Sequence, residues 1–586
     1  MLTLKLLQKN LCFRLFLFFV TSFIFIGCSG NNSVQKFEYA GGTFTFSISN
    51  EPSTFIVRDA VDFYSSTMMN QIYEGLVVFN PATLEVEPGL AKKWEVSEDG
   101  KTIHFHLRDD VYFHAHKDFP QGIKFTPEDV IYNITLACTP VNNKPTYAYS
   151  SIYKETLKGA REFYNKETDQ IEGLSVKGNT ITFELLERDI NFIDKLAQTQ
   201  AKFASKEIIE AGLETDLVGT GPFKFSAYTE IDGAMNIILL KNEKYYQKDL
   251  AGNQLPYLDS LVFIIENDNR KLLKKFEKKE VQLIDNLTTR EITEMLSEGR
   301  IQDFNGTPPQ LILVRKPLLA TQYYVFNLNE EVFKDVRVRK AINYAVDRVD
   351  IVKNILNNQA YSPGNAGIVP PDAFGGYNTE SVRLSAYDYD PQKAKNLLAQ
   401  AGYPNGEGFP SISIKYDIHP IHAEVANEIA NQLEKVLNIN VSLDGMPFQD
   451  LIQEQKEGKG QLSKKSWYAD FYSPENFLMN KYSKSSLENN STISHSNTSG
   501  YSNPLFDELL EKARSSTDII ERFNYFAQAE KVLMEDAPIL VLWYEETIKV
   551  VYSKVRNLEF NEIDLFSFKN VYFKEWTKKE WDQHAQ

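Results

Sequence analysis

The segment FKDVRVRKAINYAVD, residues 333–347, illustrates how the second half of the chain is built. Asp335 stands where its carboxylate can cap the first turn of a helix. Arg337 and Arg339 fall between the apolar positions and are expected to make surface ion pairs. The apolar residues recur at the three-and-four spacing of one helix face, at Val338, Ala341, Ile342, Ala345 and Val346. This pattern predicts a helix with one buried face.

Further helix and strand patterns follow toward the C-terminus. Helices are predicted at Asp390 to Gly402, Ala423 to Leu437, Leu505 to Arg514 and Glu521 to Met534. The second of these leads into a predicted strand at Ile439 to Leu443, and the short apolar run Ile539 to Trp543 predicts a buried strand. Ser483 to Ser502 is dense in Ser, Asn and Gly, which predicts a surface loop.

The first half of the chain favours short strands. Thr43 to Ser47 alternates like a strand, and Met68 to Leu76 predicts a helix that ends near Gly75. Hairpins are predicted at Asp99-Gly100 and within Leu174 to Leu185. Strand and helix patterns thus alternate without a fixed repeat, which predicts a mixed α/β fold.

Composition excludes several classes of protein. The 586 residues are 42% hydrophobic and 13% aromatic, which is too rich for a disordered chain. The 63 basic and 79 acidic residues give a net charge of −16 without a dense basic stripe, so nucleic acid is an unsuitable partner. Three cysteines, Cys12, Cys28 and Cys138, cannot build a disulfide framework or a C-x-x-C zinc site.

The first 27 residues have the features of a secretory signal peptide. Lys5, Lys9 and Arg14 precede an apolar run, Leu15 to Ile26, which as a helix spans about 18 Å. A hydrocarbon core is roughly 30 Å thick, so an uncleaved anchor helix is the less favoured alternative. The polar residues after Cys28 suit a flexible tether, with 28–40 as its expected extent.

Catalytic and metal motifs are weak. Neither G-x-S-x-G nor H-E-x-x-H occurs, so no catalytic residue is assigned. His104 and His106 share one face of a predicted strand, and His114 and His116 follow, which makes a zinc site conceivable. A surface hairpin with outward polar positions explains the same pattern, so no metal or cofactor is assigned.

Several segments together resemble one family. They are, in chain order, IYEGL at 72–76, PGLA at 88–91, TPEDV at 126–130, GTGPF at 219–223, LPYLD at 255–259, FKDVRVRKAINYAVD at 333–347 and WYADFYSPENFL at 467–478. In this order the segments resemble the extracytoplasmic solute-binding proteins of the oligopeptide, dipeptide and nickel group, which serve ATP-driven importers. The segment FIGC at 25–28 also resembles the bacterial lipoprotein box, which implies that Cys28 is lipidated.

The resemblance implies an α/β, two-lobed periplasmic-binding-protein fold of the class II type, with an extra subdomain inserted in the first lobe. The implied divisions are 41–84, 216–317 and 532–586 for lobe I, 85–215 for the inserted subdomain and 318–531 for lobe II. The implied molecule is an exported monomer, held by its lipid on the outer side of the cytoplasmic membrane, where it meets the permease subunits of an ABC transporter.

The resemblance also implies a ligand site. In peptide-binding members, the aspartate that stands here as Asp470 pairs with the α-ammonium group of the ligand, and Trp467 and Tyr468 are expected to wall the cleft. Alternatively, Asp470 caps the helix expected from Ser473 onward. The implied role is capture of peptides for import. The alternatives are the same role with a nickel chelate, a sugar or another small solute, and, more remotely, an exported hydrolase.

Overall fold

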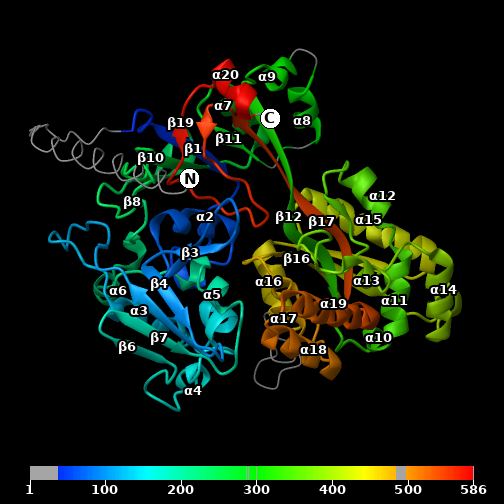
Figure 1. Ribbon diagram of the computed structural model, residues 1–586. Helices are drawn as coiled ribbons and strands as arrows, with labels where there is room; N and C mark the ends of the chain where they lie inside the picture. The colour runs from blue at the N-terminus through cyan, green and yellow to red at the C-terminus, as the bar shows by residue number, and fades with distance from the viewer. Residues whose placement is uncertain (1–36, 286, 288, 298–299, 484–496, 585–586) are drawn as a thin grey trace, which may run out of the picture.

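Two long antiparallel strands, β12 (Leu311–Phe326) and β17 (Ile539–Tyr552), join the two halves of the molecule (Figure 1). The computed structural model describes residues 37–285, 287, 289–297, 300–483 and 497–584. The expected signal peptide, Cys28, most of the tether and most of the Ser483 to Ser502 loop lie outside these residues. Among the described residues, no helix is both long enough and apolar enough to cross a membrane.

The main sheet has eleven strands and passes through both lobes. Its order is β15-β14-β16-β12-β17-β11-β1-β10-β9-β8, and β13 pairs with β17. The bounds of the other strands are β1 Thr43–Ile48, β8 Phe223–Ile231, β9 Ala234–Lys241, β10 Ser260–Ile265, β11 Leu283–Ile284, β13 Ser362–Pro363, β14 Ile412–Asp417, β15 Val441–Met446 and β16 Leu462–Tyr468. The first lobe is therefore built on β1 and β8–β11, and the second on β14–β16.

The crossing between the lobes is irregular. β12 and β17 pair continuously from Leu311 to Pro317, and the register then shifts before pairing resumes at Thr321. Within the interruption, Leu319 donates its backbone N–H to the Glu562 carbonyl at 2.7 Å instead of to β17. The ribbon is thus interrupted where it passes from one lobe to the other.

A separate sheet is inserted in the first lobe. Its order is β4-β5-β7-β6, with bounds Ala91–Val96, Thr102–Leu107, Thr180–Glu184 and Leu174–Lys177. Both predicted hairpins are present in it. Phe105 and Phe183 are fully buried between this sheet and its helices, in a core distinct from that of the first lobe. Two further short sheets are β2 (Val77–Phe79) with β3 (Val86–Pro88) and β18 (Val555–Arg556) with β19 (Tyr572–Phe573).

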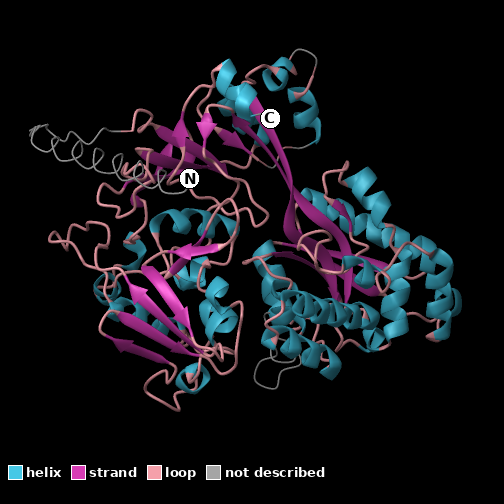
Figure 2. Ribbon diagram, viewed as in Figure 1, coloured by secondary structure: helices cyan, strands magenta, loops and turns pink. Residues whose placement is uncertain are grey.

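Helices surround the strands of the second lobe (Figure 2). Along β12, Tyr323 and Val325 belong to one hydrophobic cluster, while Tyr324 and Phe326 belong to another, so both faces of the sheet are covered. The helices of this half are α10 Glu331–Lys334, α11 Val336–Ala345, α12 Arg348–Asp350, α13 Thr379–Arg383, α14 Pro391–Gln400, α15 Pro420–Leu437, α16 Phe448–Lys456, α17 Glu475–Tyr482, α18 Pro504–Ser515 and α19 Ile519–Asp536.

The other half of the molecule has shorter helices. They are α2 Phe63–Ile72, α3 Pro127–Ala137, α4 Ala160–Tyr164, α5 Phe192–Lys195, α6 Lys206–Glu210, α7 Asn269–Glu277, α8 Thr289–Met295, α9 Gln302–Asn305 and α20 Lys578–His584. The mixed α/β prediction is confirmed, and Asp335 caps α11 through the Arg337 backbone N–H as expected.

Two local predictions need correction. The helix expected to end near Gly75 ends at Ile72, because the backbone beyond it bonds to other segments, including Phe203 and Leu90. Arg339 is buried rather than paired at the surface, and its guanidinium donates to backbone carbonyls. Gly219 allows a close approach between segments, because a Cβ there would lie 2.0 Å from the carbonyl oxygen of Ile72.

Candidate ligand-binding site

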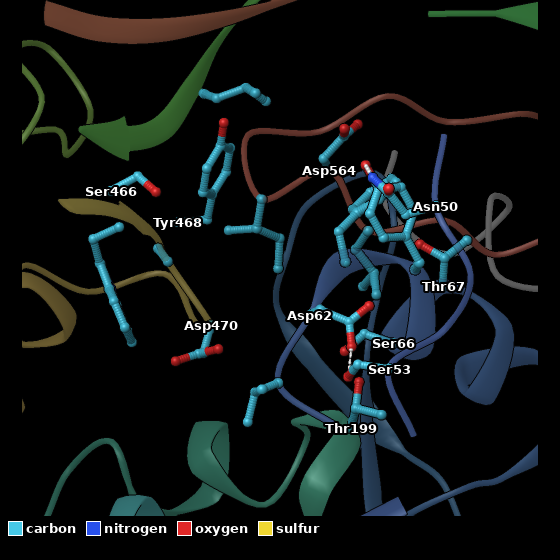
Figure 3. Close-up of a pocket in the computed structure, with 18 of the residues that line it drawn as sticks. Asn50, Ser53, Asp62, Ser66, Thr67, Thr199, Ser466, Tyr468, Asp470 and Asp564 are labelled. Atoms are coloured by element: carbon cyan, nitrogen blue, oxygen red, sulfur yellow. Dashed lines mark hydrogen bonds between the residues drawn. The ribbon is translucent and has the colours of Figure 1, made fainter. Parts of the chain in front are cut away.

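A large cavity of about 2410 Å³ lies between the lobes. β16 carries Ser466 and Tyr468 on one side of it, with Asp470 just beyond the strand (Figure 3). Facing them are short polar side chains from the first lobe and the inserted subdomain, namely Asn50, Ser53, Asp62, Ser66, Thr67 and Thr199. Pockets for drug-sized ligands are typically about 300–1,000 Å³, so this cavity is large enough for an extended ligand.

All three predicted ligand-binding residues line this cavity. β16 pairs with β12 from Leu462 to Tyr468, which fixes the strand that carries the site. The Trp467 indole N–H donates to Asn476 Oδ1 at 2.6 Å, and the Tyr468 side chain is 51% exposed. The structure therefore places an aromatic pair and a carboxylate along one wall.

Asp470 does not cap the helix that follows it. α17 begins at Glu475, its N-cap is Pro474, and no side chain caps it. The Tyr147 hydroxyl, which comes from the inserted subdomain, donates to Asp470 Oδ2 at 3.5 Å. Burial and then the negative charge of Asp470 raise the pKa of Tyr147 well above its ordinary value, so the phenol keeps its proton and can donate.

The facing wall was not predicted from the sequence. Asp62 caps α2 by accepting the Ser65 backbone N–H at 2.9 Å, and it also accepts the Ser53 hydroxyl at 2.5 Å. Thr199 donates to Asn70 at 3.0 Å. Residues 50–53 (NEPS) are typical of a turn, but nothing in the sequence indicates that they face β16 across the cavity.

Two histidines and a lysine gather near Asp417 at the start of α15, and this cluster was also not predicted. His419 and His422 line the cavity, and His422 Nδ1 lies 2.5 Å from Asp417 Oδ1. The Lys464 ammonium donates to Asp417 Oδ2 at 3.2 Å. Burial alone would raise the pKa of Asp417, but the hydrogen bond from His422 and the charge of Lys464 outweigh it and lower that pKa. The Asp417 carboxylate is therefore ionised at neutral pH.

The four histidines considered for zinc have separate partners. The side chains of His104 and His106 contact the hydroxyls of Thr182 and Thr180 across the β5–β7 pair. The ring of His114 contacts the Gly221 carbonyl, and that of His116 contacts Asp216. In the described part of the chain, no three His, Cys, Asp or Glu side chains gather in a way that could hold a metal ion.

The sequence profile of the bacterial extracellular solute-binding proteins, family 5 Middle, matches residues 85–489. The chain belongs to this family. It is 28% identical to the dipeptide-binding protein of Escherichia coli over 85% of this chain and 88% of that protein. It is 29% identical to heme-binding protein A of Haemophilus influenzae over 87% of this chain and 89% of that protein.

A solved structure has the same fold. The periplasmic binding protein DppA from Helicobacter pylori, which is associated with an ABC transporter and was solved with the peptide STSA, superposes with a TM-score of 0.77. The two chains are 25% identical, and the match covers 92% of this chain and 99% of that one. The predicted family and two-lobed α/β fold are thus confirmed, and the cavity lies between the lobes.

Proposed function

We propose that this family member captures peptides in the interlobe cavity and delivers them to the permease of an ABC importer. The observation that carries the proposal is the position of Asp470, whose carboxylate lines the cavity beside a strand. A peptide's α-ammonium would form a charge-assisted hydrogen bond there, and such bonds are about twice as strong as neutral ones. The dipeptide-binding relative and the neighbour solved with a peptide support the choice of ligand.

In this proposal, the side chains of Trp467 and Tyr468 form an apolar wall of the cavity. An aromatic surface beside a few well-placed polar groups can hold side chains of several kinds without selecting one strongly. The polar wall around Asp62 would then face the peptide backbone and polar side chains.

The proposal includes the cellular setting and the division of the chain. Residues 1–27 are removed as a signal peptide, lipidated Cys28 anchors the protein outside the cytoplasmic membrane, and 28–40 form the tether. The body works as a monomer in which 41–84, 216–317 and 532–586 form lobe I, 85–215 the inserted subdomain and 318–531 lobe II. The permease distinguishes the ligand-closed form from the open form. No catalytic residue, metal or cofactor is assigned.

The decisive measurement is calorimetry of the purified body with short peptides. Asp470→Asn should weaken binding of peptides with a free amino terminus by about tenfold or more, because a charge-assisted hydrogen bond contributes about 1.5–3 kcal/mol. N-acetylated versions of the same peptides carry no ammonium and should bind wild type and variant alike. Equal loss for both sets would remove Asp470 from ligand recognition.

The alternatives predict different outcomes of the same assay. A receptor for a nickel chelate, a sugar or another small solute would bind no peptide and would retain another molecule on native mass spectrometry. The heme-binding relative keeps a non-peptide ligand under consideration. An exported hydrolase would cleave peptides during incubation, and cleavage would replace the transport proposal.

A further inference from the structure

Lys202 is a buried cation on the wall of the cavity. It follows the short turn Thr199–Ala201, has an extended backbone, and its side chain lines the cavity while the residue is only 8% exposed. Within the described residues, no acceptor lies within hydrogen-bond or ion-pair distance of its ammonium group. Burial of an ammonium group is costly unless an acceptor compensates for it.

The nearest acid is already occupied by neutral donors. Glu74 is 4% exposed, and its carboxylate accepts the hydroxyls of Tyr245 at 2.7 Å, Tyr246 at 3.1 Å and Thr220 at 3.1 Å. Glu74 attracts Lys202 through space without forming an ion pair with it. The carboxylate is therefore satisfied by its hydroxyl donors, whereas the ammonium group is not.

A second lysine adds to the positive charge. Lys569 also lines the cavity, donates to Gln247 Oε1 at 2.8 Å and repels Lys202 electrostatically. Burial lowers the pKa of Lys202 to about 8, which leaves the group mostly protonated at neutral pH. Two lysines thus share this recess with one acid; burial also lowers the pKa of Lys569 and raises the pKa of Glu74.

Polar atoms of the adjoining wall also have no partner. Gln198 and Gln200 are each 5% exposed and line the cavity, and their side-chain oxygens have no hydrogen-bond partner among the described residues. Buried polar side chains are nearly always hydrogen-bonded in native proteins. The recess beside Lys202 therefore contains further polar side chains, although these two amide oxygens are themselves inaccessible.

We propose that Lys202, with Lys569 beside it, forms a carboxylate-binding subsite of the cavity and makes the protein selective for peptides that place a carboxylate there. The inference rests on the proposed peptide-binding function. The carboxylate comes either from an Asp or Glu side chain or from the free carboxyl terminus of the peptide. In both cases it forms a charge-assisted hydrogen bond with the ammonium group.

The test uses tetrapeptides of alanine in which one Glu or one Gln occupies position two, three or four. Each peptide is made with a free and with an amidated carboxyl terminus, and its affinity is measured by calorimetry for wild type, Lys202→Gln and Lys144→Gln. Lys144 is the matched control, because it is an exposed lysine that lines the same cavity. Melting curves of all variants report on folding.

If a side chain supplies the carboxylate, wild type and Lys144→Gln should bind at least one Glu peptide about tenfold tighter than its Gln partner, and Lys202→Gln should abolish this difference. If the terminus supplies it, amidation should produce the tenfold loss, and only in proteins that retain Lys202. Should Lys202→Gln fold poorly, Lys202→Arg keeps the charge and should keep the preference, while Lys569→Gln should reduce it.

Two results overturn the inference in distinguishable ways. If peptides bind wild type but neither Glu-to-Gln exchange nor amidation has an effect that depends on Lys202, the subsite is wrong and the peptide-binding function stands. If wild type binds none of the peptides, both the function and the subsite are wrong.

Discussion

Two clusters of buried charge, one around Lys195 at the end of α5 and one around Lys202, are built in opposite ways. In the first, Lys195 lies between two carboxylates, 2.8 Å from Asp189 Oδ2 and 2.8 Å from Glu475 Oε1. Arg514 completes it, 2.8 Å from Asp189. In the second, Lys202 has no ion-pair partner in the described residues, although it is only 8% exposed. Burial alone therefore does not distinguish a lysine that stabilises the fold from one that is proposed to bind a ligand. The presence or absence of ion-pair partners does.

The paired cluster joins two parts of the molecule. Asp189 and Lys195 come from the segment of the inserted sheet, whereas Glu475 and Arg514 come from α17 and α18 of the second lobe. Burial alone would raise the pKa of Asp189, but the charges of Lys195 and Arg514 outweigh it and lower that pKa. The cluster thus joins the inserted subdomain to the second lobe, whereas Lys202 has no such ion pair among the described residues.

Breaking the paired cluster should have the largest effect. Lys195→Met leaves two buried carboxylates with only Arg514 to compensate them, and removal of one partner of a buried ion pair typically costs about 3–5 kcal/mol. The midpoint of urea unfolding should fall accordingly. A midpoint equal to that of wild type would mean that the cluster contributes nothing to stability. It would contradict the contrast between the paired Lys195 and the unpaired Lys202.

Glu530 provides an intermediate case, because it is a buried acid with neutral partners only. It accepts the Tyr377 hydroxyl at 2.5 Å and the Val369 backbone N–H at 2.7 Å, and burial raises its pKa from 4.5 to about 7. A raised pKa means that the protonated form is favoured by folding, so this stabilisation is complete below pH 4.5 and is lost as the pH rises through 7.

Glu530→Gln should therefore flatten the dependence of the melting temperature on pH between about 4.5 and 7. The shift corresponds to about 3 kcal/mol, at about 1.4 kcal/mol for each pH unit. The measurement is the difference between variant and wild-type curves, which cancels the contributions of other titrating groups. Parallel curves would show that Glu530 keeps an ordinary pKa.

The sequence predicted the local elements well because their signals are local. The apolar spacing from Val338 to Ala345 and the cap at Asp335 specify α11, and alternation with turn residues specifies both hairpins. The strand predicted at Ile539 to Trp543 extends to Tyr552, because its second half is more polar and is held by pairing with β12.

The features that the sequence did not predict depend on contacts between segments that are far apart in the chain. Arg339 has the appearance of a surface residue on its own helix, but the end of α19 presents it with the carbonyls of Asp536 and Ala537. Asp470 was identified because a family resemblance marked it. Lys202 was not, because a lysine in an ordinary stretch of sequence shows neither its burial nor the hydroxyls that already satisfy Glu74.

An exposed ion pair should show the smallest effect and completes the comparison. Lys512 lies 2.6 Å from Glu508, one turn away on α18, and both side chains are about half exposed, at 49% and 58%. Water already solvates these charges, and holding two long side chains in one geometry costs entropy, so exposed pairs contribute little. Lys512→Met should leave the urea midpoint unchanged within error, whereas Lys195→Met lowers it, although the ion-pair distances are nearly equal. A comparable loss in both variants would mean that ion-pair distance, rather than burial, sets the contribution of these pairs to stability.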